Sequence, residues 1–300
     1  MESARDRREP RFVIAGAVKA ATTWTARRLA EHPRVFIPGP EPHYFSDEHH
    51  RGFDWYLSLF SEAPEGAIIG EKSADYLAHP LAAERLADAL PAARIIVQLR
   101  NPVDRAYSDY CMLYRRGETR RPAGDYFRKS ASDNEHLGSR FLIGGLYATH
   151  LRRIYDRFPR EQVLVELYDD IAASPQETMA RITDHIGVDR IDIDLASTAR
   201  ENDSASEMLP LHVRKALRPF KAAIKPLRGK AWFKSLRGAF ARPISYPPLD
   251  DEARSFLADY YSRDVEALSV LVKKELSHWL TVPPPRGGDR RAGSPAELVN

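Results

Sequence analysis

The chain has 300 residues, 43% of them hydrophobic, which is enough to build the core of one large α/β domain or of two small ones. Its net charge of +3 is too small to indicate a nucleic-acid partner, and its single cysteine, Cys111, excludes an internal disulfide and a cysteine-rich zinc site. No apolar stretch approaches the roughly 18 residues of a membrane span, and the N-terminus lacks the apolar core of a signal peptide, so we expect a cytoplasmic protein.

Short apolar segments alternate along the chain with longer amphipathic segments. The apolar segments predict strands at 12–17, 67–70, 94–99 and 162–167, and the amphipathic ones predict helices at 23–32, 79–90, 102–116, 146–158, 175–187 and 250–273. This alternation favours an α/β fold, a single P-loop-like domain whose central parallel β-sheet is flanked by helices on both faces. We expect the domain to span 11–280, between a flexible N-terminus at 1–10 and a disordered tail at 281–300.

A loop of small residues follows the first predicted strand and leads into the first predicted helix. It reads Gly16-Ala-Val-Lys19-Ala-Ala-Thr22-Thr23-Trp24. Small side chains let a phosphate approach the backbone, amides at the helix N-terminus point toward it, and Lys19 adds positive charge. The loop differs from the P-loop of nucleoside triphosphatases, G-x-x-x-x-G-K-[ST], because Lys19 comes three residues before Thr22. Taken alone, this segment fits an ordinary strand-to-helix turn equally well.

Three further motifs follow this loop. They read Pro40-Glu-Pro-His-Tyr-Phe-Ser46, Gly70-Glu-Lys-Ser-Ala-Asp-Tyr76 and Ile95-Ile-Val-Gln-Leu-Arg-Asn-Pro-Val-Asp-Arg-Ala-Tyr-Ser-Asp-Tyr110. In order and spacing, the four motifs resemble those of the sulfotransferases that use 3′-phosphoadenosine 5′-phosphosulfate (PAPS) as donor, in particular the bacterial and heparan-sulfate-type branch. The similarity covers residues 11–190 and resumes at 245–280.

The resemblance implies a donor site at the first and fourth motifs. In such a site Lys19 contacts the 5′-phosphosulfate of PAPS, and Arg100 and Ser108 hold the 3′-phosphate. An arginine suits a phosphate because its planar guanidinium donates two parallel hydrogen bonds. The residues implied in donor binding are Lys19, Ala20, Ala21, Thr22, Thr23, Trp24, Arg100 and Ser108.

The second and third motifs carry the residues that the resemblance assigns to catalysis and acceptor binding. Glu41 is the general base, and His43 assists it because the pKa of a histidine lies near neutrality. Lys72, like Lys19, balances charge near the transferring group. Asp75 joins Glu41, His43 and Lys72 in binding the acceptor.

Glu71 competes with Glu41 for the role of base, because it adjoins Lys72 and follows a predicted strand. Neighbouring residues in an extended segment point to opposite faces. We therefore expect that Glu71 and Lys72 do not both face the site, and we favour Glu41 as the base.

Two of the departures from the family pattern concern donor binding. Ala21 stands where the family usually has glycine, which costs about 1 kcal/mol if this position requires a positive φ. The family's late Lys-Gly-Arg loop, which closes over the nucleotide, is not recognisable, and Arg228-Gly229-Lys230 and Arg237-Gly238 are candidates to replace it. Both candidates lie in 209–249, a basic segment without acidic residues, for which we expect a helical lid or insert.

These motifs predict a PAPS-dependent sulfotransferase (EC 2.8.2 type). It moves the sulfuryl group in line to a hydroxyl of a carbohydrate or natural product and releases adenosine 3′,5′-bisphosphate. We expect a small-molecule or glycan acceptor, free or bound to a carrier protein, with no metal and no nucleic acid. The arginine- and alanine-rich composition favours a bacterial source.

Two other classes of function stay open from the sequence. An atypical P-loop phosphotransferase would use ATP and would need Asp104 or Asp169 as a magnesium ligand. A non-catalytic module would use the basic segment 209–249 to hold an anionic partner.

Overall fold

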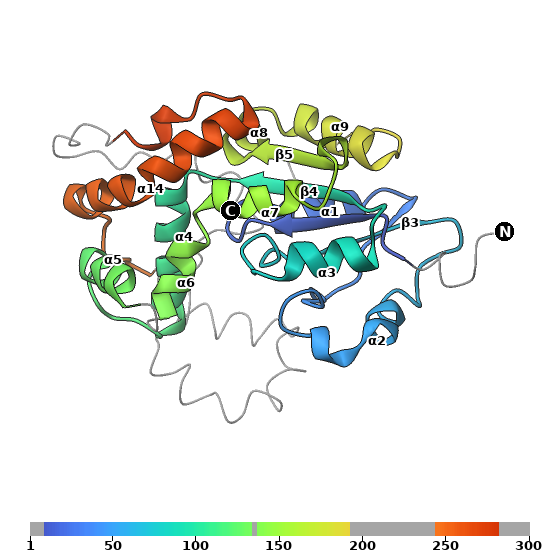
Figure 1. The fold of residues 1–300 in the computed structure, drawn as a ribbon, viewed down its shortest axis with the longest axis horizontal. Helices are drawn as coiled ribbons and strands as arrows, with labels where there is room; N and C mark the ends of the chain where they lie inside the picture. Colours follow the sequence, from blue (N-terminus) through green and yellow to red (C-terminus); the bar gives the residue numbers. More distant parts are fainter. Residues whose placement is uncertain (1–8, 134–136, 193–243, 282–300) are drawn as a thin grey trace, which may run out of the picture.

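A five-stranded parallel sheet lies at the centre of the computed structural model, which describes residues 9–133, 137–192 and 244–281 (Figure 1). The strands are β1 (Phe12–Gly16), β2 (Val35–Phe36), β3 (Ile68–Lys72), β4 (Arg94–Leu99) and β5 (Val163–Leu167), in the spatial order β2-β3-β1-β4-β5. Four of them lie where the apolar segments predict strands. The fifth, β2, is too short to produce a sequence period.

Ten α-helices lie in the described ranges. Six correspond to predicted helices: α1 (Thr22–Ala30), α3 (Ala82–Ala89), α4 (Pro102–Arg116), α7 (Tyr147–Tyr155), α9 (Pro175–Ile186) and α14 (Asp251–Val272). Four were not predicted: α2 (Phe53–Ser58), α5 (Ala123–Ser132), α6 (Leu137–Ile143) and α8 (Tyr168–Ala173). Three 3₁₀ turns occur at His49–Arg51, Arg160–Gln162 and Ser277–Trp279. Within these ranges, no helix has both the length and the apolar character that a membrane span requires.

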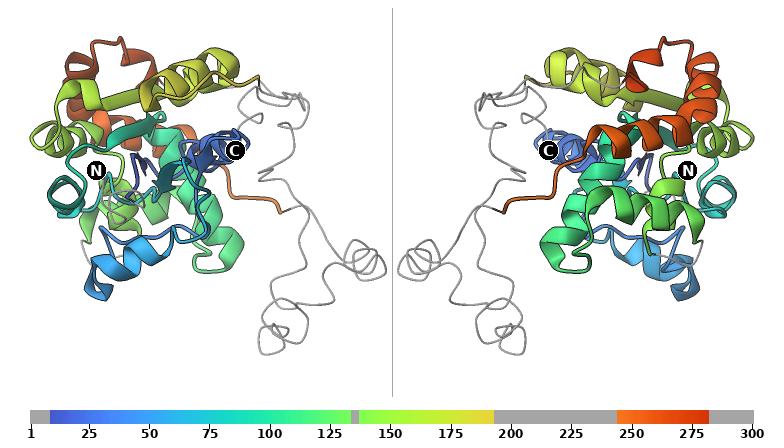
Figure 2. Two further views of the ribbon diagram at one scale, coloured as in Figure 1. Left: turned by 90° about the vertical axis from the view of Figure 1, so that its right-hand side faces the viewer. Right: turned by 90° about the vertical axis from the view of Figure 1, so that its left-hand side faces the viewer.

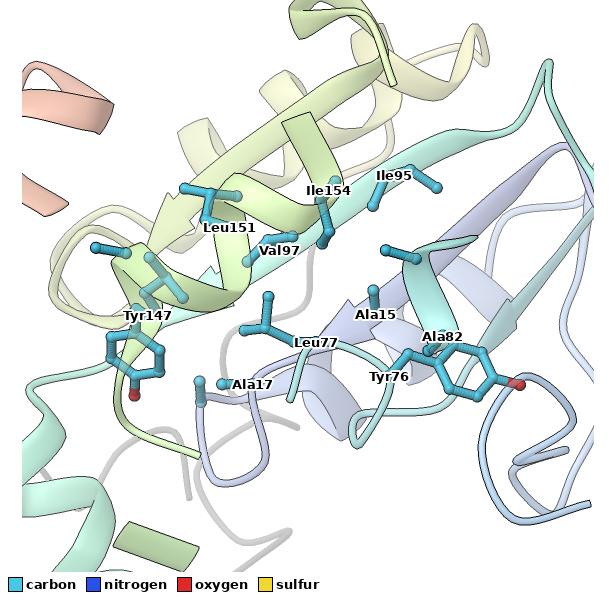
Figure 3. Packing of buried hydrophobic residues seen from close by; sticks show 14 of the residues in the cluster. Ala15, Ala17, Tyr76, Leu77, Ala82, Ile95, Val97, Tyr147, Leu151 and Ile154 are labelled. Carbon is cyan, nitrogen blue, oxygen red and sulfur yellow. The ribbon is translucent and has the colours of Figure 1, made fainter. Parts of the chain in front are cut away.

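Helices cover both faces of the sheet, as the predicted alternation of strands and helices requires (Figure 2). On one face, the buried residues of α3, α4, α7 and α14 form a single cluster with the strands. Figure 3 shows part of this cluster, in which Leu151 and Ile154 of α7 lie over Ile95 and Val97 of β4, close to Ala15 of β1. Successive residues of a strand point to opposite faces, so the residues next to these in sequence pack against the helices on the other face of the sheet.

The opposite face of the sheet has a smaller core of its own. Phe12 and Ile14 of β1 and Ile96 of β4 pack there against Trp24 of α1 and Met179 of α9, and all five residues are buried. Strands that are buried on both faces explain why the sequence shows continuous apolar runs rather than an alternation of apolar and polar residues.

Helix α4, which carries the fourth motif, is fixed at both ends. At its N-terminus the side-chain Oδ1 of Asn101 accepts hydrogen bonds from the amides of Val103 (2.9 Å) and Asp104 (3.4 Å). The side-chain Nδ2 of Asn101 donates to the carbonyl of Trp279 (3.0 Å), which joins α4 to the C-terminal part of the domain. Gly117, with φ 78°, ends the helix in the left-handed conformation that favours glycine.

Most of the basic segment lies outside the described residues, as do both Lys-Gly-Arg candidates and nearly all of the two chain ends. Its last six residues, 244–249, are described and form neither helix nor strand, so the expected helix does not extend to 249. They run along α4, where the hydroxyl of Tyr107 donates to the carbonyl of Pro247 (3.1 Å) and the rings of Tyr114 and Tyr246 meet edge to face.

Candidate active site

The four motifs meet at one edge of the sheet. Strands β3, β1 and β4 are adjacent and parallel, with Ile14 of β1 in register with Lys72 of β3 and Ile96 of β4. The first motif follows β1, the third includes the end of β3, and the fourth begins in β4 and continues into α4. In open parallel sheets, ligands bind beyond these carboxyl ends.

The first loop leaves β1 through a glycine that no other residue can replace without strain. Gly16 has φ 145°, and a Cβ atom built on it would lie 2.7 Å from the carbonyl oxygen of Ala74 and 2.8 Å from the Cβ of Leu77. The loop then turns through two non-glycine residues with positive φ, Lys19 (69°) and Ala21 (65°), before α1 begins at Thr22.

The sequence departure at Ala21 therefore falls on a position that does require the left-handed conformation. Holding an alanine there costs about 1 kcal/mol relative to glycine. The loop still turns into α1, so the substitution leaves the loop with backbone strain rather than with a different path. Strain of this kind persists only where the surrounding structure fixes the backbone.

The surroundings of Lys19 are positively charged. Burial lowers the pKa of the Lys19 amine, Asp109 opposes that shift, and Arg116, Arg100 and Arg115 lower the pKa further. Repulsion between these cations and the half-buried amine is unfavourable, and a bound anion would reduce it. The electrostatics of this loop therefore favour an anionic ligand.

Arg100 lies directly after β4 and beside the first loop. It is 7% exposed, and its Nη1 donates a hydrogen bond to the carbonyl oxygen of Lys19 (3.3 Å). Its guanidinium also lies over the ring of Tyr168, 4.5 Å from the ring centroid. Ser108 is half-buried in α4, two turns further along the chain. The structure thus brings the first and fourth motifs into direct contact at Arg100.

Glu41 and Lys72 form an ion pair that joins the second and third motifs. Oε1 of Glu41 contacts Nζ of Lys72, while Oε2 accepts a hydrogen bond from the amide of Ala74 (3.2 Å). Nζ of Lys72 also donates to Oγ1 of Thr23 in α1 (3.2 Å). Three motifs therefore share one hydrogen-bonded chain, with the side chain of Lys72 10% and that of Glu41 33% exposed.

A second charged pair lies beside the first. Nδ1 of His43 and Oδ1 of Asp75 are 2.7 Å apart. The hydrogen bond to Asp75 raises the pKa of His43, and burial opposes that shift only in part. Burial by itself would raise the pKa of Asp75, but hydrogen bonds with His43 and Ser46 outweigh it and lower that pKa. With Nδ1 engaged, Nε2 is the ring nitrogen of His43 that remains for a ligand.

Glu41, His43 and Asp75 each offer one ligand atom within 4.8 Å of the others, a spacing that could hold a metal ion. Sequence spacing gives no sign of this cluster, because Asp75 comes from a different motif. Glu41 already contacts Lys72 and the amide of Ala74, and His43 and Asp75 are already paired with each other. A metal-free site remains a prediction.

Glu71 points away from this site, as strand alternation predicts. It is fully buried and accepts hydrogen bonds from three hydroxyl groups, whereas Lys72 faces Glu41 and Thr23. Burial raises the pKa of Glu71 to about 7, although these hydroxyl groups oppose the shift. A side chain enclosed in this way cannot reach an acceptor, so of the two glutamates only Glu41 stays a candidate for the base.

Three of the side chains predicted to bind the donor face the protein interior instead. Ala20, Thr22 and Trp24 are at most 4% exposed, and the Trp24 ring belongs to the core beneath α1. Thr22 and Trp24 can serve a ligand only through backbone amides of the first helical turn, which lack partners within the helix.

The two aspartates that a phosphotransferase would need have other contacts. Asp104 pairs with Arg254 of α14 (3.1 Å). Asp169 accepts a hydrogen bond from the indole Nε1 of Trp279 (2.9 Å) and lies 3.6 Å from Nε2 of His278. The two carboxylates therefore connect α4 and α8 to the C-terminal part of the domain.

Two site residues were missed by the sequence analysis. Tyr168 stacks on Arg100 and directly follows β5, the neighbour of β4, so the rule that parallel strands share one binding edge could have indicated it. Ser73 accepts a hydrogen bond from the amide of His43 (3.0 Å), and its place beside Lys72 gave no signal because small hydroxyl residues are common after strands.

Comparison with known proteins points to one family. A sequence model described as "Sulfotransferase family" matches residues 48–192. The chain is 28% identical over 289 residues to the human bifunctional heparan sulfate N-deacetylase/N-sulfotransferase 2, covering 89% of this chain and 30% of that protein. It is 32% identical over 188 residues to the mouse heparan sulfate glucosamine 3-O-sulfotransferase 3A1, covering 61% of this chain and 47% of that protein.

A solved structure extends the similarity to three dimensions. The crystal structure of a sulfotransferase from Alicyclobacillus acidocaldarius superposes with a TM-score of 0.65 at 27% identity, covering 90% of this chain and 98% of that one. The chain spans about a third of the length of the bifunctional relatives that it matches. In its parallel sheet, in the four motifs at the edge of that sheet and in these comparisons, the chain is similar to members of the sulfotransferase family.

Proposed function

We propose that this protein transfers the sulfuryl group of PAPS to a hydroxyl of a carbohydrate or natural-product acceptor. The observation that carries the proposal is the hydrogen-bonded chain from Thr23 through Lys72 to Glu41. It joins the N-terminus of α1, where we place the phosphosulfate, to a carboxylate through one ammonium group. The match to the sulfotransferase family model supports the reaction class, and the heparan sulfate relatives support a glycan acceptor.

The residues present fit the donor chemically. The N-terminus of α1, Lys19 and Lys72 together favour the 5′-phosphosulfate end, and Arg100, fixed against Tyr168, suits a phosphate on the ribose. Ser108 of α4 would add a hydroxyl to that phosphate. When bound, PAPS supplies the sulfuryl group together with a phosphate leaving group. Lys19 and Lys72 would stabilise the negative charge that develops there.

Glu41 would take the proton from the attacking hydroxyl. A carboxylate can act as base when it lies within hydrogen-bonding reach of the acceptor and is held in place. Lys72 and the amide of Ala74 hold one oxygen each, and the side chain remains one-third exposed. His43, oriented by Asp75, would bind or orient the acceptor through Nε2. Glu41, His43, Lys72 and Asp75 thus form the proposed acceptor side of the site.

The proposed compartment, bacterial source, metal-free reaction and carrier-bound acceptor rest on composition and on the contacts of the site residues. One cysteine in 300 residues is typical of a reducing compartment, which supports a cytoplasmic protein, and the arginine-rich composition supports a bacterial one. The side-chain partners of Glu41 and His43 support a reaction without a metal. An acceptor tethered to a carrier protein is compatible with a half-exposed acceptor side.

Transfer of labelled sulfate from PAPS tests the proposal. Heparan sulfate oligosaccharides serve as probe acceptors. We expect Glu41→Gln to lower kcat by about 10²- to 10⁴-fold, because the amide cannot accept the proton. Glu166→Gln is the matched control, since Glu166 is a buried carboxylate on β5 that pairs with Arg181 (2.7 Å) on another element. Wild-type turnover by Glu41→Gln would remove Glu41 as the base.

The same assay addresses the phosphotransferase alternative. Lys19→Ala should weaken transfer from PAPS, because it removes one of the two amines that we place at the phosphosulfate. Phosphate transfer from ATP and magnesium, in the absence of sulfate transfer, would overturn the proposed function. The contacts of Asp104 with Arg254 and of Asp169 with Trp279 argue against that outcome.

A further inference from the structure

A buried carboxylate lies on the side of β3 that faces away from the proposed site. Glu71 is 0% exposed, and its oxygens accept hydrogen bonds from the hydroxyls of Tyr56 (2.7 Å), Ser73 (2.9 Å) and Tyr76 (3.2 and 3.3 Å). Burying a carboxyl group is unfavourable unless such partners compensate for lost water. Three hydroxyl donors converge on one carboxyl group and stabilise its ionised form, which only accepts hydrogen bonds, against the burial that disfavours that form.

Two of these hydroxyls also touch the backbone of the second motif. Oγ of Ser73 accepts a hydrogen bond from the amide of His43 (3.0 Å), and the hydroxyl of Tyr76 accepts one from the amide of Phe45 (3.2 Å). A hydroxyl has one proton to donate and two lone pairs. When that proton points to Glu71, the lone pairs are left to accept the amide hydrogens. Glu71 therefore determines which way both hydroxyls are oriented.

The segment held in this way follows closely after the proposed base, Glu41. His43 has a positive φ of 51°, a conformation that needs support from its surroundings. From another direction, Nη1 of Arg85 donates to the carbonyls of Phe45 (3.1 Å) and Ser46 (3.0 Å). Residues 43–46 are thus fixed through both their amides and their carbonyls, and Glu41 lies two residues before them.

We propose that Glu71 is a positioning residue, whose carboxylate acts through Ser73 and Tyr76 to hold the backbone of residues 43–45 so that His43 and Glu41 face the acceptor. The proposal rests on the proposed function for the meaning of that geometry. It does not require Glu71 to touch a substrate, and burial prevents it from doing so. Tyr56, the third donor to Glu71, comes from α2 and touches the second motif through its ring, which stacks on Tyr44 and meets Phe45 edge to face. Among the hydrogen bonds of the described residues, its hydroxyl makes none to that motif.

The first test replaces Glu71 with glutamine and measures kcat at pH 8. The amide keeps the size of the side chain, but its NH₂ group donates, so Ser73 or Tyr76 must turn its hydroxyl away. We expect kcat to fall by about 10- to 100-fold, as for a small misplacement of catalytic groups. Affinity for adenosine 3′,5′-bisphosphate should stay within about 2-fold, because Lys19 and Arg100 are untouched. Wild-type kcat would overturn the proposal, as would a loss no larger than that of Glu166→Gln.

We call the action of Glu71 on residues 43–45 through Ser73 and Tyr76 the relay. A matched pair of tyrosine variants separates an effect of the relay from a general effect of losing a buried hydrogen bond. Tyr56→Phe and Tyr76→Phe each remove one hydroxyl from Glu71 and keep the ring, but of these two hydroxyls only that of Tyr76 is hydrogen-bonded to the second motif. We expect Tyr76→Phe to lower kcat by at least about fivefold more than Tyr56→Phe. In a double-mutant cycle, Glu71→Gln and Ser73→Ala should cost less together than the sum of their separate effects. Equal effects of the tyrosine variants, or additivity in the cycle, would contradict a relay.

An experiment that needs no turnover distinguishes failure of the relay from failure of the proposed function. The pKa of the His43 imidazole is followed by NMR in labelled protein, with His43→Gln to assign its signal among the ten histidines. Asp75 raises this pKa in the wild type, and a loosened segment should bring it toward 6.5 in Glu71→Gln. If this pKa shift occurs but the wild type transfers no sulfate from PAPS, Glu71 does position His43 and the proposed function is wrong. An unchanged pKa would reject the relay.

Discussion

Glu71 makes folding stability depend on pH in a direction opposite to that of most carboxylates. Burial raises its pKa from 4.5 to about 7 in the folded protein. The folded state therefore holds this proton more tightly than the unfolded chain does. The group contributes stability below pH 4.5, and this contribution is lost as the pH rises through about 7.

The size of the effect follows from the shift. The difference between 7 and 4.5 is 2.5 pKa units, which at 1.36 kcal/mol per unit is about 3 kcal/mol. Between pH 5 and pH 8, the linkage relation gives a loss of about 2.5 kcal/mol. Replacing Glu71 with glutamine removes the titrating group, so the variant should lack this loss.

Urea unfolding of the wild type and Glu71→Gln at pH 5, 6, 7 and 8 measures the effect. The difference between their free energies of unfolding cancels the contributions of all other titrating groups. We expect that difference to change by about 2.5 kcal/mol in favour of the variant as the pH rises from 5 to 8. A difference that stays constant to within about 0.5 kcal/mol would show that Glu71 titrates normally and would refute the reasoning.

Three further predictions follow from local geometry. Ala21→Gly should raise the free energy of unfolding by about 1 kcal/mol in urea, because φ is 65° at this position, and a decrease would contradict the strain. Asp75→Asn should lower the pKa of His43 toward 6.5 in an NMR titration, and an unchanged pKa would exclude the pairing as its cause. Asn101→Ala should cost about 1–2 kcal/mol in thermal unfolding, because it removes the cap of α4 and the contact with Trp279, and a cost near zero would show that neither contributes.

The apolar runs and amphipathic periods of the sequence predicted most of the strands and helices. β1 is continuously apolar and β4 largely so, because both faces of these central strands are buried, and such runs are visible without a structure. The two residues of β2, Val35 and Phe36, carry no such signal. Helices α2 and α8, each of six residues, are shorter than two helical turns and therefore show no amphipathic period.

The candidate site was predictable wherever a motif marks it. The alternation argument on β3 separates Lys72 from Glu71 correctly, because it needs only the extended conformation of the strand. The pairing of His43 with Asp75 depends on how two loops from different motifs approach each other, which local spacing does not encode. Local spacing also does not encode the contact of Tyr168 with Arg100, because these residues follow β5 and β4, which lie far apart in the sequence. Trp24 was assigned to donor binding by its place in the motif, while its side chain belongs to the core.

Calorimetric titration with adenosine 3′,5′-bisphosphate tests the central claim most directly. If the edge formed by Lys19, Arg100 and Ser108 holds a nucleotide with a 3′-phosphate, this ligand should bind about 10- to 100-fold more tightly than adenosine 5′-monophosphate. Arg100→Ala should abolish that preference without removing binding through the first loop. Equal affinity for the two nucleotides, or tighter binding of ATP with magnesium, would contradict the account.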